Sequence, residues 1–243
     1  MYDNYIFDLY GTLADIRTNE ENPYLWKKMT EIYASYGAGY DRGELRRAFR
    51  DRCHELEKTA ENRWFEPNVT EVFQWCFSQK GISVSLEIAR NVAITFRVLS
   101  RKYIKVYDGV IELLEALKAS GKKIYLLSNA QSDFTRPEIT LLGLEKYFDG
   151  IFISSEVGVK KPGVEFYEKL LKTYGITPAK SIMIGNDIKA DILGAKAVGL
   201  NTLYILSNIS PAEDVEKQGV DFGATYTVWD GDFKKIASLV CKE

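Results

Sequence analysis

Short apolar segments recur through the second half of this 243-residue chain, and stretches with helical periodicity separate them. Their runs are continuously apolar rather than alternating, as in strands that are buried on both faces of a parallel sheet. The helical stretches, such as PGVEFYEKLLKTYG, give the order strand, helix, strand that is typical of right-handed βαβ units. The expected strands lie in the segments 122–130, 150–156, 181–187, 201–207 and 224–230, with YIFDLY near the N-terminus as the first. We therefore predict an α/β fold with a three-layer, doubly wound parallel sheet.

The region from residue 17 to residue 100 has a different character. It is rich in Arg, Glu, Trp and Tyr, and its apolar residues mostly recur with a helical period. Breaks between four helical segments fall at residues 37–43, 64–68 and 81–83. The last of these segments continues to Tyr103. We expect residues 1–16 and 101–243 to form an α/β core domain, and residues 17–100 to form a helical-bundle cap domain.

The composition is that of a protein with a packed core and a polar surface. Apolar residues make up 46% of the chain and charged residues 27%, and the net charge is −2. This charge gives no reason to expect nucleic acid or an anionic membrane as a partner. No apolar run is long enough to span a membrane, no signal-peptide pattern is present, and Cys53, Cys76 and Cys241 form no CxxC pair. We expect a cytoplasmic protein, and the sequence leaves open whether it forms a homodimer.

Polar residues follow four of the predicted strands. They are Asp8, then Ser128 and Asn129, then Lys160 and Lys161, and finally Asn186, Asp187 and Asp191. Each has an ordinary structural explanation as a helix cap, a turn residue or a solvated side chain. Ligands of open α/β sheets, however, bind outside the carboxyl ends of the strands. A carboxylate, a hydroxyl, an ammonium and an acidic loop at one edge suit nucleophilic displacement on an anionic substrate.

Four motifs carry a resemblance to the haloacid dehalogenase (HAD) superfamily of hydrolases. They are FDLYGTL at residues 7–13, LLSNA with Ser128, SSEVGVKKPGVEFY with Lys161, and IGNDIKADILGA. The resemblance covers nearly the whole chain, and the order and spacing of the motifs are specific. The helical insertion directly after the first motif resembles the family's first class of cap.

The resemblance implies that Asp8 attacks the substrate and forms a covalent aspartyl intermediate, which water then hydrolyses. Lys161 and the hydroxyls of Ser128 and Thr12 would offset charge at the reacting centre. Gly11, which permits a tight exit from the strand, and Asn129 are expected to contact the substrate. Tyr10 completes the set of expected catalytic residues.

The resemblance to the phosphatases of this family also implies a Mg²⁺ ion. Its expected ligands are Asp8, the backbone carbonyl of Tyr10, and residues among Asn186, Asp187 and Asp191. Mg²⁺ prefers oxygen ligands and keeps several waters, so a site built partly by protein suits it. Asn186 contributes no charge, so Asp187 or Asp191 has to supply the negative ligand. An alternative for Asp191 is a salt bridge that orients Lys161.

Tyr10 departs from the phosphatase pattern, which usually has a second Asp two residues after the nucleophile. A phenol titrates near ~10, so it could donate a proton but is a poor base at neutral pH. Tyr followed by Gly-Thr-Leu resembles the 2-haloacid dehalogenases, which release a halide without a proton and without a metal. Ile188 opposes that alternative, because it stands where these enzymes carry an Asn.

The dehalogenases also use an Arg of the cap to bind the substrate carboxylate. Arg46 and Arg50 are four residues apart and lie on one helix face, where they could form either a clamp for the substrate anion or a solvated basic surface.

Three functions follow in order of preference. The first is Mg²⁺-dependent hydrolysis of a small phosphate monoester. The second is metal-independent dehalogenation of a 2-haloacid, and the third is a HAD-fold binding or regulatory module with little turnover. The partner expected in every case is a small anionic metabolite.

Overall fold

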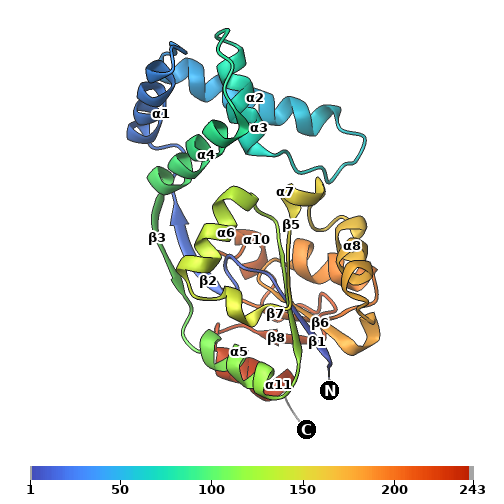
Figure 1. Ribbon diagram of the computed structural model, residues 1–243. Coiled ribbons are helices and arrows are strands. Elements are labelled where there is room, and N and C mark those ends of the chain that lie inside the picture. Colours follow the sequence, from blue (N-terminus) through green and yellow to red (C-terminus); the bar gives the residue numbers. More distant parts are fainter. Residues whose placement is uncertain (1, 241–243) are drawn as a thin grey trace.

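A six-stranded parallel sheet in the order β5-β4-β1-β6-β7-β8 forms the centre of the molecule (Figure 1), in a computed structural model that describes residues 2–240. The predicted three-layer α/β fold is confirmed. The strands are β1 Asn4–Phe7, β4 Lys123–Ser128, β5 Gly150–Ile153, β6 Ser181–Gly185, β7 Asn201–Ile205 and β8 Tyr226–Val228. Cys241 and the last residues of the predicted core lie outside the described residues.

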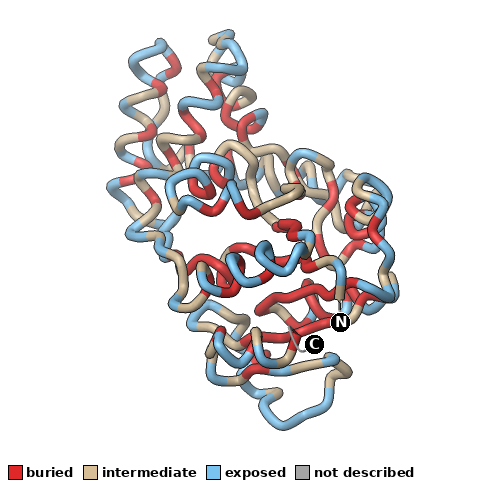
Figure 2. The backbone as a smooth tube through the Cα atoms, turned by 60° about the horizontal axis from the view of Figure 1, so that its bottom comes forward, coloured by how far each residue is buried: buried red, intermediate tan, exposed pale blue. Residues whose placement is uncertain are grey.

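Apolar side chains on both faces of the sheet explain why its strands are continuously apolar. Tyr5 and Phe7 of β1 pack on one face of the sheet, whereas Ile6 packs on the other. Figure 2 shows the buried backbone running through the centre of the core. The helices of the core are α5 Val110–Ala119, α6 Ser132–Leu141, α7 Ser154–Val157, α8 Val164–Tyr174, α9 Gly194–Ala197, α10 Ala212–Val215 and α11 Phe233–Val240. Shorter turns of helix span Glu145–Tyr147, Pro178–Lys180 and Ile188–Leu193.

The strand order determines where the polar strand ends meet. β1 lies between β4 and β6, and Phe7 is in register with Leu126 on one side and Ile184 on the other. Asp8 follows Phe7 directly, Ser128 ends β4, and Asn186 follows β6. These three residues therefore lie side by side at the carboxyl edge of the sheet.

Helices α1 to α4 stand over this edge and have an apolar cluster of their own (Figure 1). They span Pro23–Ser35, Arg42–Thr59, Val69–Ser78 and Leu86–Ser100. Aromatic rings form much of the cluster, and Phe73 and Phe96 each contact Phe49. The helices follow the predicted breaks closely, and the division of the chain into a core and a cap domain stays a prediction.

The chain enters and leaves these helices through an antiparallel pair of strands, β2 Ala14–Thr18 and β3 Arg101–Val106. The sequence does not predict this ribbon. The expected cap boundary at residue 17 falls inside β2, and the expected helix through Tyr103 ends at Ser100. The partners of the ribbon are far apart in the sequence, so their pairing overrides the local helical pattern.

The loop between α2 and α3 also contacts the core. Lys160 N donates to Trp64 O at 2.8 Å, and Glu66 N donates to Gly158 O at 3.2 Å. Glu66 further accepts hydrogen bonds from Gln131 and Ser154 at 3.1 Å each. The helical layer is thereby attached to the segment that directly precedes Lys161. Within residues 2–240, no helix is both long and apolar enough to cross a membrane.

Candidate active site

Asp8 lies where β1 ends and the chain turns, and its carboxylate borders a cavity of about 200 Å³. Oδ1 accepts a hydrogen bond from Lys161 Nζ at 2.7 Å, whereas Oδ2 lies 3.4 Å from the Thr12 hydroxyl. The turn requires glycine at Gly11, because its φ is +87° and a Cβ there would lie 2.3 Å from Asn186 Nδ2. Oδ2 has the weaker hydrogen bond, so it is the oxygen better placed to act as a nucleophile.

Lys161 connects the strand ends through its buried ammonium group. Nζ donates to Asp8 Oδ1 and Asp191 Oδ1 at 2.7 Å each, and to Leu127 O at 2.8 Å. An ammonium has three donors, so all of them are used. Burial opposes its charge, but the carboxylates of Asp191 and Asp8 outweigh burial and raise the pKa of Lys161. The group therefore stays cationic beside Asp8.

Asp191 is buried and serves as the second carboxylate partner of Lys161. Its Oδ2 accepts a hydrogen bond from Asp187 N at 3.1 Å. Burial and repulsion from Asp8 raise the pKa of Asp191 above its usual value, while the attraction of Lys161 opposes this rise and favours the carboxylate. Gly185 at the end of β6 makes room for this carboxylate, since a Cβ there would lie 2.2 Å from Asp191 Oδ2. The sequence analysis missed Gly185, although it directly precedes Asn186.

Ser128 presents a free hydroxyl at the end of β4. The residue is fully buried, and its Oγ has no hydrogen-bond partner. Among the buried side-chain oxygens and nitrogens of the described residues, only the Tyr204 hydroxyl shares this property. An unpaired buried hydroxyl costs roughly 1–3 kcal/mol. Ser128 is not among the residues that border the cavity at Asp8, so its contact with a ligand stays a prediction.

Asn129 holds the backbone of Lys161 from both sides. Its side-chain oxygen accepts a hydrogen bond from Lys161 N at 2.7 Å, and its Nδ2 donates to Lys161 O at 2.9 Å. The residue borders the cavity at Asp8. The expected contact of Asn129 with substrate stays a prediction, and in this structure both ends of its amide position Lys161 instead.

The fourth motif brings Asn186 and Asp187 to the same cavity. Asn186 Oδ1 accepts a hydrogen bond from the Thr12 hydroxyl at 3.2 Å, and its Nδ2 lies 3.4 Å from Ser210 Oγ. Asp187 accepts a hydrogen bond from Ala190 N at 2.7 Å and thereby caps the helical turn Ile188–Leu193. Both residues retain side-chain lone pairs that could face an ion.

The donor set fits a hard cation with oxygen ligands. The cavity is bordered by the carboxylates of Asp8 and Asp187, the amide of Asn186 and Tyr10. No cluster of three or more His, Cys, Asp or Glu side chains within residues 2–240 is arranged to hold a metal by itself. Asp191 is occupied by Lys161. An ion such as Mg²⁺ would therefore need the Asn186 amide oxygen, a backbone carbonyl and waters to complete its coordination shell. Mg²⁺ sites in proteins usually keep several waters in this way.

Tyr10 borders the cavity, but its hydroxyl is directed to α6. The hydroxyl donates to Glu138 Oε2 at 2.5 Å and lies 3.0 Å from the Thr135 hydroxyl. Burial, followed by the charge of Glu138, raises the pKa of Tyr10 well above its usual value. A phenol held in this way is neither a base nor a free proton donor at neutral pH.

Arg46 and Arg50 lie in a different place. Both pair with the exposed carboxylate of Glu21, and together with Gly43 they border a separate surface hollow. The structure does not bring them to the cavity at Asp8, and their contact with substrate stays a prediction. Of the described residues that border that cavity, none is an arginine.

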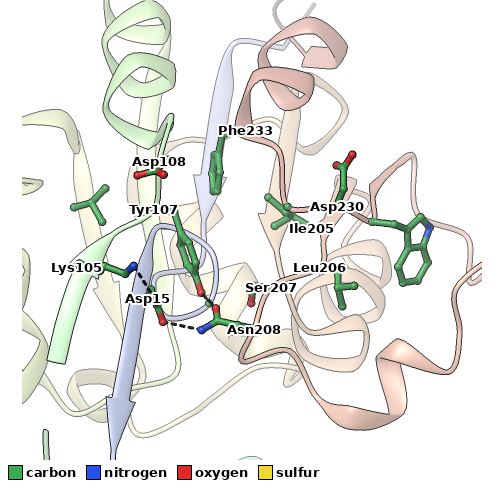
Figure 3. Close-up of a pocket in the computed structure, with 14 residues that line it drawn as sticks. Asp15, Lys105, Tyr107, Asp108, Ile205, Leu206, Ser207, Asn208, Asp230 and Phe233 are labelled. Atoms are coloured by element: carbon green, nitrogen blue, oxygen red, sulfur yellow. Dashed lines mark hydrogen bonds and ion pairs between the residues drawn. The ribbon is translucent and has the colours of Figure 1, made fainter. Parts of the chain in front are cut away.

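A second cavity, of about 560 Å³, lies between the β2–β3 ribbon and the loop that follows β7 (Figure 3). Asn208 bridges its two sides: Nδ2 donates to Asp15 Oδ1 at 2.9 Å, and Oδ1 accepts a hydrogen bond from the Tyr107 hydroxyl. Neither Asp8 nor Lys161 borders this larger cavity. Its polar residues therefore fasten the ribbon to the core rather than form the reaction site.

Comparison with known proteins agrees with these features. The family model described as "haloacid dehalogenase-like hydrolase" matches residues 2–199. A glyceraldehyde 3-phosphate phosphatase of Methanothermobacter thermautotrophicus is 31% identical over 130 residues, which are 53% of this chain and 58% of that protein. A phosphoserine phosphatase of Thermus thermophilus is 28% identical over 153 residues, which are 63% of this chain and 60% of that protein. The chain thus matches less than two thirds of the length of either relative.

A solved structure of similar fold belongs to a 2-haloacid dehalogenase of Pseudomonas syringae pv. Tomato. It superposes with a TM-score of 0.71 at 17% sequence identity, and the match covers 99% of both chains. An identity this low supports the fold alone. The choice between phosphate and halide chemistry therefore depends on the residues of the site.

Proposed function

Because the chain belongs to the haloacid dehalogenase-like hydrolases, we propose that it hydrolyses a small phosphate monoester through a covalent intermediate on Asp8. One observation carries this proposal. The cavity at Asp8 is bordered by the carboxylates of Asp8, Asp187 and Asp191 and by a single ammonium, that of Lys161. An anionic substrate is repelled by such a cavity unless a cation joins it. The phosphatase relatives support the same choice.

The described residues can share the steps as follows. Oδ2 of Asp8 attacks phosphorus while Lys161 holds Oδ1, and the bond from phosphorus to the leaving oxygen breaks. The hydroxyl of Ser128 and the ammonium of Lys161 stabilise the charge on the phosphoryl oxygens. Water then attacks the phosphorus of the aspartyl phosphate, the bond from phosphorus to Asp8 Oδ2 breaks, and inorganic phosphate leaves with the protons of that water, so that the carboxylate of Asp8 is restored.

Mg²⁺ is the proposed cofactor, held by Asp8, the carbonyl of Tyr10, Asn186 and Asp187. When bound, it would reduce the repulsion between the Asp8 carboxylate and the phosphate. A cytoplasmic location and a small phosphorylated metabolite as partner belong to the same proposal.

The state of Tyr10 bears on the leaving group. Its hydroxyl donates to Glu138, so it cannot also donate to the departing oxygen. We expect that oxygen to take its proton from water, which favours substrates with acidic leaving groups. The same observation favours a second candidate, the dehalogenation of a 2-haloacid, because a halide leaves without a proton.

One experiment separates these functions. The purified protein is incubated with or without Mg²⁺, and phosphate release is measured from aryl and alkyl phosphates alongside halide release from 2-chloropropionate. We expect Mg²⁺-dependent phosphate release that is faster from p-nitrophenyl phosphate than from alkyl phosphates. Halide release that persists in EDTA would overturn the proposal in favour of the dehalogenase. No release of either product at high enzyme concentration would favour a binding or regulatory module.

A further inference from the structure

Glu138 is a buried carboxylate at the meeting point of four segments, although it belongs to none of the sequence motifs. It lies on α6 with 2% of its surface exposed. Its Oε1 accepts hydrogen bonds from Arg97 Nε and Arg101 Nη1 at 2.8 Å each. Its Oε2 accepts from Tyr10 at 2.5 Å and from Arg97 Nη2 at 3.1 Å. A bidentate arginine, a second arginine and a phenol thus use both oxygens.

The partners of Glu138 come from three separate parts of the chain. Arg97 lies in the last turns of α4, and Arg101 is the first residue of β3. Tyr10 lies two residues after Asp8 and borders the same cavity. The Arg97 guanidinium also lies over the Tyr10 ring, 5.4 Å from its centroid. One carboxylate therefore joins the base of the helical layer, the ribbon and the turn that carries Asp8.

Because the cluster around Glu138 is held by charged groups, the loss of any one of them is expected to disturb the others. Two guanidinium groups, with 12% and 19% of their side chains exposed, face one buried carboxylate, so removal of the carboxylate takes away the anion that both cations share. Removing one partner of a buried ion pair is far more disruptive than losing an exposed pair. Burial opposes the charge of Glu138, yet the hydrogen bonds and charge of Arg97, together with the hydrogen bonds from Tyr10 and Arg101, outweigh burial and lower the pKa of Glu138.

We propose that Glu138 is a positioning residue for the reaction: it holds Tyr10 beside Asp8 and ties that position to the helical layer through Arg97 and Arg101. Its kinetic consequence rests on the proposed hydrolysis at Asp8. The turn at residues 9–14 is the element it controls, where the amides of Thr12, Leu13 and Ala14 all point to Leu9 O. Displacement of Tyr10 would shift this turn and with it the backbone carbonyl of Leu9, the residue that directly follows Asp8.

The chain offers a matched control on the same two helices. Arg90 of α4 pairs with Asp133 of α6 at 2.9 Å. This pair joins the same two helices as the Arg97–Glu138 pair, but the Tyr10 hydroxyl donates to Glu138 and not to Asp133. The test compares Glu138→Gln, Tyr10→Phe, the double variant and Arg90→Gln. Because Arg90 is exposed, Arg90→Gln controls for the loss of an ion pair between α4 and α6 that does not involve Tyr10, and the double variant tests whether Glu138 acts through Tyr10.

We expect Glu138→Gln and Tyr10→Phe each to lower kcat/KM for phosphate release by roughly tenfold, and the double variant to be no slower than the slower single variant. Arg90→Gln is expected to stay within about twofold of wild type. Additive losses in the double variant, or an unchanged kcat/KM in Glu138→Gln, would overturn the proposal.

A second measurement does not depend on turnover. Hydrogen exchange of the amides at residues 9–14 should be faster in Glu138→Gln and Tyr10→Phe than in wild type, and unchanged in Arg90→Gln. If the wild type is inactive but shows this exchange pattern, the proposed hydrolysis is refuted and the positioning of the turn by Glu138 is supported. If the wild type is active but the pattern is missing, the hydrolysis is supported and the positioning role is refuted. Should Glu138→Gln fail to fold, Tyr10→Phe and Arg97→Lys keep Glu138 charged, and wild-type kcat/KM in both would overturn the proposal.

Discussion

Lys161 and Asp191 form an ion pair that is closed to solvent, with 2.7 Å between Nζ and Oδ1 and 2% of each side chain exposed. Asp8 shares the same ammonium at the same distance. Loss of one partner from a buried pair costs about 3–5 kcal/mol, because the remaining charge is left uncompensated. Asp191 therefore holds Lys161 in place beside Asp8. Because Asp191 is occupied by this ion pair, the side-chain oxygens that remain for a metal are those of Asp8, Asn186 and Asp187.

Gly185→Ala is expected to disturb this pair without a substitution at either of its residues. The new Cβ would lie 2.2 Å from Asp191 Oδ2, so the carboxylate has to move away from Lys161. We expect at least a tenfold loss of kcat/KM, about 1.4 kcal/mol in the activation barrier, in a protein that still folds by circular dichroism. Gly39→Ala is the control, because a Cβ at Gly39 meets nothing within 4 Å. Similar kinetics in the two variants would contradict the role given to Asp191.

Asp8→Asn should lower turnover by more than about a thousandfold, since an amide cannot form the aspartyl intermediate. Lys161 keeps Asp191 as its anion, so we expect the variant to fold. Phosphate release under single-turnover conditions measures the effect. Asp3→Asn, an exposed residue just before the same strand, controls for the loss of a carboxylate. Substantial residual activity in Asp8→Asn would remove Asp8 from the role of nucleophile.

Ser128→Ala separates a functional hydroxyl from a structural one. Because Ser128 Oγ has no partner, its removal should leave the free energy of unfolding unchanged or slightly higher, while kcat/KM falls. Ser154 is the matched control, since its buried hydroxyl donates to Glu66 and accepts from Ala130 N at 2.8 Å. Ser154→Ala should lose about 1–3 kcal/mol of stability by urea denaturation. A Ser128→Ala variant that is destabilised but fully active would refute this assignment.

Acid should weaken the contribution of Glu138 to stability. Its pKa in the folded protein is lower than usual, so its stabilising effect is complete above the ordinary glutamate pKa of about 4.3 and disappears as the pH falls through the lower folded value. The difference in free energy of unfolding between wild type and Glu138→Gln is therefore expected to stay constant from about pH 6 to pH 5 and to shrink as the pH falls from there toward pH 3. Urea denaturation across this range measures it. A difference that does not change with pH would show that Glu138 is not ionised in the folded protein.

The order of the elements could be predicted because it leaves local signals. Continuous apolar runs indicate strands buried on both faces, and glycines and capping residues end the helices at predictable places. From the sequence, Asp191 could be either a metal ligand or the salt-bridge partner of Lys161, and in the structure it pairs with Lys161. The contact of Asn129 with substrate, which its type and position suggested, stays a prediction, and the structure adds that both ends of its amide hold the backbone of Lys161.

By itself, the sequence determined the parallel α/β fold, the helical insertion and the strand ends that carry Asp8, Ser128 and Lys161, because periodicity and motif spacing are properties of the chain. The tertiary structure alone decided which long-range partners those residues have. The β2–β3 ribbon and the two arginines that meet Glu138 beside Tyr10 join segments distant in sequence, and the space that Gly185 leaves for Asp191 depends on how the chain turns between these two residues. A buried charge takes the partner that the packing brings within hydrogen-bond distance, and no local pattern records that choice.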